Sequence, residues 1–386
     1  LSASDGSDGL MPPKYTPEGP AMIIYTSGTT GRPKGVVTRH SALEAQISDQ
    51  VTEWKWTQDD RVLNCLPLHH VHGLVNGTCV PLSCGAAIEY IEPKPDRLWK
   101  RFRLGDMAGP GLSVFMAVPT IYSKLIENFD QMPKDVQDAS SQAVGDLRVM
   151  ISGSAALPTT IMEKWKQITG HTLLERYGMT EFAMGLTNPL EPVEARQPGF
   201  VGVPFPSIKV KIVDEKTREV VDPASGKSGE LLITGPGVFK EYWNKPEATA
   251  KEFDDEGWFK TGDVAAFDPQ LQSYQILGRA SADIIKSAGY KISGLEIERV
   301  LLEHPGLAEI AVLGVPNEEY GEIVAAVVVM RNGYKFDPSE LKKFAQERLA
   351  KYKIPTSFKE LASEIPKNAM GKVSKKQLKQ DLFKVT

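Results

Sequence analysis

The sequence lacks the features that mark membrane, secreted and nucleic-acid-binding proteins. Among its 386 residues no apolar run approaches the roughly 18 residues needed to cross a bilayer. The opening Leu1–Gly9 has neither the basic start nor the apolar stretch of a secretory signal. The formal net charge is only −4, which argues against a general nucleic-acid surface. We therefore expect a globular chain with no membrane span and no nucleic-acid partner.

Cysteine is also scarce. The three cysteines, Cys65, Cys79 and Cys84, show no C-x-x-C spacing, and an odd number cannot pair completely. Buried thiols in a reducing compartment are the simplest interpretation.

The length and the apolar pattern predict two domains. A chain of 386 residues exceeds the roughly 250–300 residues over which a single core usually grows. Before Gly278-Arg279, short apolar runs alternate with helical patterns, which predicts α/β layers with partly parallel sheets. The predicted strands are Ala21–Tyr25, Arg61–Leu66, Ala86–Ile91, Ser113–Val118 and Leu147–Ser152, and the predicted helices are Ser41–Trp54, Pro119–Glu127 and Pro158–Thr169. We expect the large domain to span residues 1–279.

Residues 280–386 have a different pattern and predict a separate small α+β domain. Its predicted elements are a strand over Asp283–Ile292, helices near Gly294–Glu303 and Pro338–Ala350, and strands Ile310–Val315 and Ile323–Met330.

The most informative segment runs from Tyr25 to Gly35 and follows a predicted strand. It combines glycines, four hydroxyl side chains and Lys34. Glycines let successive backbone N–H groups turn toward an anion, and hydroxyl groups add further donors. A P-loop is excluded by spacing, because Gly28 and Gly31 are separated by only two residues and no Gly-Lys-Ser/Thr occurs. The segment therefore predicts a different kind of phosphate-binding loop.

This loop resembles the phosphate-binding signature of the adenylate-forming superfamily, which contains acyl-CoA synthetases, luciferases and adenylation domains. Further motifs of the superfamily follow in the same order: Tyr177-Gly178-Met179-Thr180-Glu181, Trp258–Asp263, Gly278-Arg279 with Lys286–Lys291, and Pro366–Lys372. The resemblance implies a large N-terminal domain of layered α/β sheets and a small, mobile α+β C-terminal domain. It also implies ligation of a carboxylic acid to coenzyme A through an acyl-adenylate, with release of AMP and pyrophosphate.

The resemblance assigns roles to individual residues. The catalytic residues would be Lys372, His70, Thr180 and Glu181, with Glu181 also holding Mg²⁺. The ATP-binding residues would be Thr26, Ser27, Gly28, Thr29, Thr30, Gly31, Lys34, Gly153, Ser154, Ala155, Glu175, Tyr177, Gly178, Asp263 and Arg279. Among these, Tyr177 would stack on adenine, and Asp263 would accept hydrogen bonds from the ribose with help from Arg279.

The small domain would carry the remaining machinery. Lys372 would bridge the carboxylate and the α-phosphate during adenylation. The domain would then rotate about a hinge at Ser281 or Ala282 and present the Gly289 loop to coenzyme A, with Lys286 and Tyr290 beside it. The hinge motif is one residue longer than the common pattern and lacks the usual charged residue.

Four further stretches, His69–Gly73, Phe115–Tyr122, Ile151–Pro158 and Glu175–Glu181, make the resemblance nearest to malonyl-CoA synthetases of the plant and mitochondrial type. Arg176, beside the predicted adenine-stacking tyrosine, would pair with the second carboxylate of a short diacid. The acyl pocket would also contain His72 and Met179. An alternative is that Arg176 forms a structural ion pair with Glu175 or Glu181. Arg97, Arg101 and Arg103 are weaker candidates for binding the diacid.

Several alternatives remain open at this point. The three histidines of His69-His70-Val71-His72 could suggest zinc, but no Cys or acidic residue is spaced to complete a site. The phosphate loop begins near residue 25, whereas members of the family carry a large segment before it, so we expect a chain without that front part. A ligase for short monoacids, a non-catalytic nucleotide-binding form and a carrier-protein-loading enzyme are the rival functions. The cytoplasm and the mitochondrial matrix are both compatible locations, and no protein partner is implied.

Overall fold

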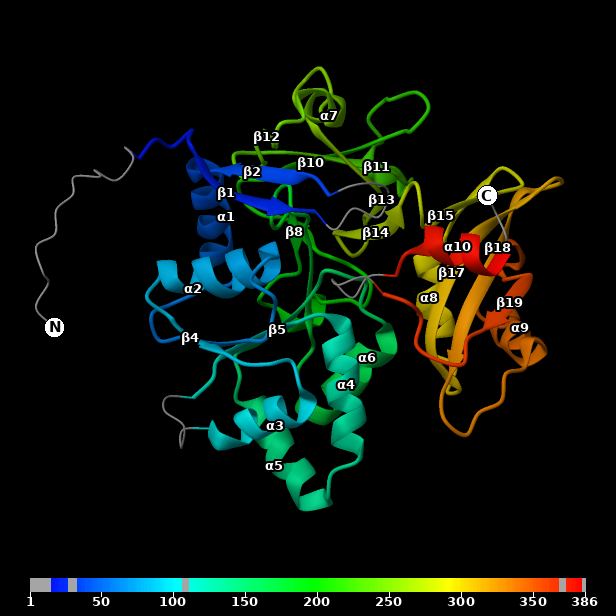
Figure 1. Cartoon of the computed structure of the whole chain (residues 1–386), viewed down its shortest axis with the longest axis horizontal. Coiled ribbons are helices and arrows are strands. Elements are labelled where there is room, and N and C mark those ends of the chain that lie inside the picture. Colours follow the sequence, from blue (N-terminus) through cyan, green and yellow to red (C-terminus); the bar gives the residue numbers. More distant parts are fainter. Residues whose placement is uncertain (1–14, 27–32, 106–110, 368–372, 384–386) are drawn as a thin grey trace, which may run out of the picture.

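The computed structural model describes residues 15–26, 33–105, 111–367 and 373–383. Four β-sheets and the helices around them make up these residues (Figure 1). No helix in this described part of the chain is both long and apolar enough to span a membrane. The largest sheet lies at the centre, and the C-terminal elements from β15 onward form a separate body at the right of Figure 1.

The largest sheet has seven strands in the order β4-β3-β5-β6-β7-β8-β9. Its first five strands are parallel, and the last two are antiparallel. The strands are β3 (Arg61–Asn64), β4 (Ala87–Tyr90), β5 (Val114–Ala117), β6 (Val149–Ser152), β7 (Leu174–Tyr177), β8 (Leu186–Thr187) and β9 (Val203–Pro204). The apolar runs of β5 and β6 are completely buried, as expected for strands covered on both faces.

Four helices pack together beside this sheet, as the lower part of Figure 1 shows. They are α3 (Pro95–Leu104), α4 (Pro119–Asp130), α5 (Lys134–Gly145) and α6 (Thr159–Thr169). Proline at the first turn of α3 and α4 fits the helix start, because its missing N–H would have no partner there. Trp99, Tyr122 and Trp165 are fully buried where these helices meet, and the Trp165 ring contacts the other two. This aromatic core fixes the helices against β5 and β6.

A three-stranded antiparallel sheet holds the ends of the predicted phosphate loop. It consists of β1 (Pro20–Tyr25), β2 (Gly35–Arg39) and β12 (Glu241–Tyr242). Helix α1 (His40–Glu53) follows β2 directly. A π-helical segment, His72–Cys79, continues into α2 (Val80–Ser83) beside α1, and the sequence pattern did not predict it.

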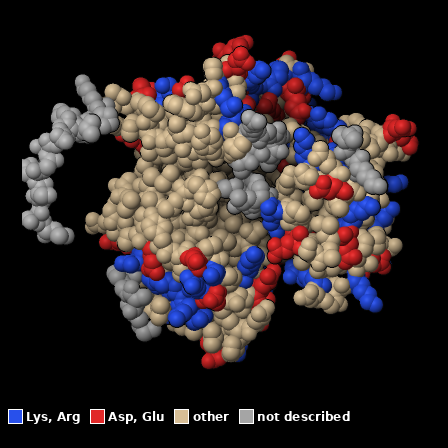
Figure 2. All heavy atoms as spheres, in the orientation of Figure 1, with Lys and Arg blue, Asp and Glu red and all other residues tan. Residues whose placement is uncertain are grey.

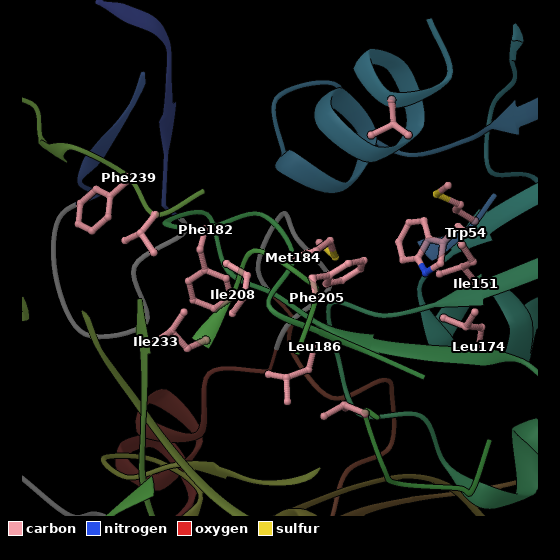
Figure 3. Packing of buried hydrophobic residues seen from close by; sticks show 14 of the residues in the cluster. Trp54, Ile151, Leu174, Phe182, Met184, Leu186, Phe205, Ile208, Ile233 and Phe239 are labelled. Atoms are coloured by element: carbon pink, nitrogen blue, oxygen red, sulfur yellow. The ribbon is translucent and has the colours of Figure 1, made fainter. Parts of the chain in front are cut away.

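A four-stranded antiparallel sheet completes the larger part of the chain, in the order β10-β11-β13-β14. Its strands are β10 (Lys209–Val213), β11 (Gly229–Thr234), β13 (Phe259–Asp268) and β14 (Ser273–Arg279), and α7 (Pro246–Glu252) lies beside β12 and β13. One hydrophobic cluster joins this sheet to the seven-stranded one. Figure 3 shows Ile233 of β11 close to Phe182 and Ile208, while Trp54, Ile151 and Leu174 lie at the other end of the cluster.

The C-terminal body contains a five-stranded sheet and three helices. Its strands are β15 (Ile284–Ser287), β16 (Tyr290–Ser293), β17 (Leu307–Asn317), β18 (Gly321–Met330) and β19 (Ser357–Glu360), and its helices are α8 (Gly294–Leu301), α9 (Pro338–Gln346) and α10 (Lys375–Phe383). Both signs of charge are interspersed over this body in Figure 2. Since β14 and β15 belong to different sheets, the change of sheet falls between Arg279 and Ile284; the domain boundary at residue 279 stays a prediction.

One predicted element was wrong. The single strand expected over Asp283–Ile292 is a β-hairpin, in which β15 and β16 pair with Ser287 opposite Tyr290. The two turn residues, Ala288 and Gly289, have φ values of +48° and +84°, the pattern of a tight hairpin turn. Ile284–Ser287 and Tyr290–Ser293 are therefore two short strands, and Gly289 permits the reversal between them.

Candidate functional site

The parallel sheet brings separate sequence motifs to one edge. Strands β3, β5, β6 and β7 are neighbours, so the segments that follow them lie at the same edge of the sheet. Such an edge is where α/β sheets bind ligands. The histidine segment follows β3, Gly153 follows β6 and Tyr177 ends β7. Residues more than a hundred positions apart therefore converge because of the strand order.

Tyr177, Asp263 and Arg279 form one hydrogen-bonded network. The Tyr177 hydroxyl donates to Asp263 Oδ2 at 2.5 Å, and Arg279 Nε lies 3.0 Å from Asp263 Oδ1. Arg279 Nη1 also donates to the carbonyl of Thr261 at 2.6 Å. Burial, followed by the adjacent Asp263 charge, raises the pKa of Tyr177 well above its ordinary range, so the hydroxyl stays protonated. Asp263 therefore pairs with Tyr177 and Arg279 through different carboxylate oxygens.

Lys34 and Glu181 are brought together by a residue that the sequence did not single out. Tyr242, on the two-residue strand β12, donates from its hydroxyl to Glu181 Oε1 at 2.7 Å. Lys34 Nζ lies 4.2 Å from the centre of the same ring and 2.8 Å from Glu252 Oε1. Burial raises the pKa of Glu181, while the Tyr242 hydrogen bond and the Arg279 and Lys34 charges act in the opposite direction. The cation and the carboxylate predicted for ATP and Mg²⁺ thus share one corner of the molecule.

The two ends of the predicted phosphate loop lie on paired antiparallel strands. Tyr25 pairs with Gly35, the Thr26 amide donates to the Lys34 carbonyl at 2.9 Å, and the Lys34 amide donates to Thr26 Oγ1 at 3.2 Å. These bonds hold the two ends of the loop together. The predicted phosphate-binding residues Ser27, Gly28, Thr29, Thr30 and Gly31 lie outside the described residues, as does the predicted catalytic Lys372.

Glycines around β6 and β7 allow close packing. A side chain at Gly153 would place its Cβ 2.4 Å from Arg176 Cζ, and one at Gly178 would place it 1.9 Å from the Ala183 carbonyl oxygen. The adjoining Ser154 has φ of +70°, and Ala155 is exposed. The segment after β6 therefore lies directly against the Arg176 guanidinium.

Arg176 is buried and incompletely paired. Its side chain is 4% exposed, and its Nε and Nη2 atoms have no hydrogen-bond partner among the described residues. Ion pairs with Glu175 or Glu181, the alternative interpretation of this residue, are likewise absent from the described part of the chain. Burial lowers the pKa of Arg176 to about 9, so the guanidinium is still charged at neutral pH. A buried charge of this kind requires a counter-charge.

His72 lies next to this charge and is neutral. Burial first, and then the Arg176 and His70 charges, hold the pKa of His72 well below its ordinary value. Its Nδ1 lies 3.3 Å from Ser154 Oγ, while its Nε2 is buried without a partner among the described residues. Ser152 Oγ, at the end of β6, is also buried and unpaired in that part of the structure. Arg176 and His72 thus provide buried polar groups that a small polar ligand could satisfy.

The remaining candidates have other surroundings. His70 Nδ1 accepts the His72 backbone N–H at 3.1 Å. Met179 packs against the main hydrophobic cluster, and Thr180 is half-buried beyond β7. The three weaker arginine candidates each have partners already: Arg97 with Glu92, Arg101 with Glu89, and Arg103 with Ser140. The acidic partners of Arg97 and Arg101 make these two arginines poor alternatives to Arg176.

The predicted thioester loop and hinge lie in the C-terminal body and at its junction. Gly289 forms the β15–β16 turn, the Lys286 amide donates to Glu322, and the Tyr290 ring stacks on Tyr352 with centroids 4.5 Å apart. These contacts stay within the small body and do not join the Tyr177 network. Ser281 and Ala282 lie in a turn closed by the Asp283 amide, which donates to the Arg279 carbonyl at 2.8 Å.

Glu175, on β7, carries a buried carboxyl group. Its Oε1 accepts the Gly199 backbone N–H at 2.9 Å, and only 5% of the residue is exposed. Burial raises the pKa of Glu175 to about 7, although the Gly199 bond and the Arg299 charge act in the opposite direction. Its predicted nucleotide-binding role is not apparent in these contacts and stays a prediction.

Comparison with known proteins finds relatives along nearly the whole chain. A family model described as AMP-binding enzyme matches residues 2–243, and one described as AMP-binding enzyme C-terminal domain matches residues 296–372. The mitochondrial malonate–CoA ligase ACSF3 of Bos taurus is 47% identical over 402 residues, covering 99% of this chain and 67% of the relative. A malonate–CoA ligase of Arabidopsis thaliana is 44% identical over 380 residues, covering 94% of this chain and 61% of the relative.

A solved structure is similar over almost the same extent. The crystal structure of ATP-bound MatB from Rhodopseudomonas palustris matches with a TM-score of 0.84 and 36% sequence identity, covering 95% of this chain and 69% of that one. The chain thus spans 61% and 67% of the two curated relatives and a similar share of this structure.

We expect Glu175→Gln to remove a pH dependence of stability. The folded-state pKa of Glu175, about 7, lies above its ordinary value of 4.5. Between these two pH values the folded chain therefore keeps the Glu175 proton, whereas the unfolded chain has lost it. The free energy of unfolding should therefore fall as pH rises through this window, relative to the variant, by at most about 1.4 kcal/mol per pH unit. Chemical denaturation across the window measures the difference. The exposed Glu163→Gln is the control, and parallel pH profiles for the parent and Glu175→Gln would contradict the assignment.

Proposed function

This chain belongs to the AMP-binding enzyme family, and we propose that it is an AMP-forming acid–CoA ligase whose acid is malonate. The expected resemblance to the adenylate-forming superfamily, the α/β large domain and the C-terminal domain are confirmed by the family models and the MatB structure. The activity itself is supported by the functions of the relatives and by the site geometry.

The proposed reaction has two steps. A carboxylate oxygen of malonate attacks the α-phosphorus of ATP, which forms malonyl-adenylate and releases pyrophosphate. The thiolate of coenzyme A then attacks the acyl carbon, forms the thioester and releases AMP. The protein mainly positions the reactants and offsets charge on the phosphate oxygens.

The Lys34–Tyr242–Glu181 corner suits the polyphosphate of ATP. Lys34 lies at the end of the hairpin loop and can exchange its Glu252 contact for phosphate oxygens. Glu181 would contribute a carboxylate to Mg²⁺, a hard cation that prefers carboxylate and phosphate oxygens. The described residues hold no cluster of three potential metal-binding side chains, which fits an ion held largely by the nucleotide. Tyr177 and Asp263 would bind adenine and ribose beside this corner.

The unpaired, buried Arg176 carries the proposal of a diacid. A monoacid would leave the guanidinium without a counter-charge, whereas the second carboxylate of malonate would neutralise it. The neutral His72 beside it adds a hydrogen-bonding group without adding a second positive charge. Methylmalonate would keep the same charge pairing but must also fit one more methyl group, so we expect it to react more slowly.

The small domain would complete the reaction through residues that differ between the two steps. Lys372 would bridge the reacting carboxylate and the α-phosphate in the first step. In the second step the Gly289 turn, with Lys286 and Tyr290, would face the pantetheine arm of coenzyme A after rotation about Ser281 or Ala282.

We expect Arg176→Met to lose discrimination between malonate and propionate, because the variant no longer pairs the second carboxylate. The kcat/KM ratio of the two acids should fall by an amount equivalent to about 2–5 kcal/mol. The measurement is pyrophosphate release across a panel of acids with ATP and coenzyme A. Arg97→Met, which removes an exposed arginine paired with Glu92, is the matched control and should keep the parent's ratio.

Two results of the acid panel would count against the proposal. Preference of the parent chain for acetate or propionate would support a monoacid ligase instead. ATP binding without acid-dependent AMP release would support a non-catalytic nucleotide-binding protein. An unchanged ratio in Arg176→Met would show that another group recognises the second carboxylate.

We expect Lys372→Ala to separate the two half-reactions. Malonate-dependent exchange of pyrophosphate into ATP should be abolished, because the cation that offsets the charge at the α-phosphate is lost. Conversion of supplied malonyl-adenylate to the thioester should continue. Lys376→Ala, an exposed lysine four residues later, is the control. Equal loss of both half-reactions in Lys372→Ala would exclude an adenylation-specific role.

A further inference from the structure

A buried ion cluster lies where the last helix meets the junction between the two bodies. Lys375 Nζ, at the start of α10, is 2.6 Å from Asp283 Oδ1 and 2.7 Å from Glu298 Oε1 of α8. The three side chains are only 9%, 16% and 15% exposed. A lysine so placed between two carboxylates is held far more tightly than one on the surface, where ion pairs contribute little.

Both carboxylates also accept hydrogen bonds from the backbone. Asp283 Oδ2 accepts the Arg279 amide at 2.9 Å, across the turn that contains Ser281 and Ala282. Glu298 Oε1 accepts the Val312 amide of β17 at 2.7 Å. Lys375 therefore connects α10 with three other elements: the junction turn, α8 and β17. Figure 1 shows α10 across the same side of the small body as β15 and α8.

The cluster continues into the nucleotide-binding network. The Arg279 amide donates to Asp283, and the Arg279 side chain pairs with Asp263. Asp263 in turn accepts the Tyr177 hydroxyl. An unbroken series of polar contacts thus runs from Lys375 to Tyr177. It connects the start of α10 with the proposed adenine-binding residue on β7.

The segment before α10 is held on its other side as well. Lys367 and Val373 form an antiparallel β-bridge, and Lys367 Nζ is 2.7 Å from Glu309 Oε1 of β17. In the sequence, Lys372 lies between the two bridge residues, directly before Val373 and three residues before Lys375. The described residues on both sides of Lys372 are therefore fixed to the small body.

We propose that Lys375 is a positioning residue for adenylation, which fixes the start of α10 to the junction turn so that Lys372 is presented at the correct place. This inference rests on the proposed function. Lys375 touches no reacting group, and it acts through Asp283 and Glu298. An interaction of this kind matters most in the step that uses Lys372, because small displacements of a positioned group sharply reduce the rate.

Hydrogen exchange tests the structural part of the inference without requiring activity. Lys375→Met should increase amide exchange in the turn at residues 279–283, since Asp283 loses the cation that holds it. Lys379→Met is the matched control, because Lys379 lies one turn later on α10 and pairs with Glu322 at 3.3 Å. Unchanged exchange at residues 279–283 in Lys375→Met would overturn the proposed connection.

The half-reactions test the functional part. In Lys375→Met, malonate-dependent pyrophosphate exchange should fall by about 100-fold, while thioester formation from supplied malonyl-adenylate should change by less than about threefold. Lys375→Arg should restore most of the exchange activity, and Lys379→Met should resemble the parent in both assays. The double variant Lys375→Met/Glu298→Gln removes one of the two carboxylates left without a cation. It should remain folded by thermal unfolding and keep the same selective loss.

The outcomes separate this inference from the proposed function. Absence of malonate-dependent exchange in the parent chain contradicts the malonate ligase itself, and hydrogen exchange still decides whether Lys375 holds the junction turn. An active parent whose Lys375→Met variant adenylates normally overturns the positioning role. Equal loss of both half-reactions, in the single and the double variants, assigns Lys375 a general structural role and overturns the inference as well.

Discussion

The requirement that a buried charge be compensated connects the main features of this structure. Lys375 finds its compensation in Asp283 and Glu298. Arg279 finds it in Asp263, which also accepts the Tyr177 hydroxyl. Arg176 differs from these two, because no ion pair joins it to a carboxylate among the described residues, and its Nε and Nη2 also lack hydrogen-bond partners there. The charge at the proposed acid site is therefore left for a ligand to compensate.

The neighbours of Arg176 determine how much charge the acid pocket presents. A protonated His72 would add a second positive charge beside the guanidinium, but burial and Arg176 itself keep the imidazole neutral. The surroundings of Arg176 therefore offer one positive charge together with the uncharged His72 ring and Ser154 hydroxyl. In the proposed reaction, this charge would match the single carboxylate that malonate retains after its other carboxylate has been activated.

Local sequence signals predicted the elements but not the long-range pairings that complete the site. Apolar runs and proline starts located β5, β6 and α4, and the Gly/Thr/Lys pattern located the loop between β1 and β2. The bond between Tyr242 and Glu181 had no local signal, since β12 is only two residues long and is defined by its pairing with β2. The β15–β16 hairpin was missed because its turn is only two residues long, so that the two short strands were interpreted as one. The Lys375 cluster likewise depends on residues about 90 positions apart in the sequence.

Gly153 limits which residue can stand at position 176 of the proposed acid site. The guanidinium occupies the volume that any side chain at position 153 would fill. The two positions therefore constrain each other: a larger residue at 153 is compatible only with a smaller or displaced residue at 176. In the proposed ligase, substrate range would consequently depend on this residue pair, and one member of the pair would contribute to selectivity by having no side chain.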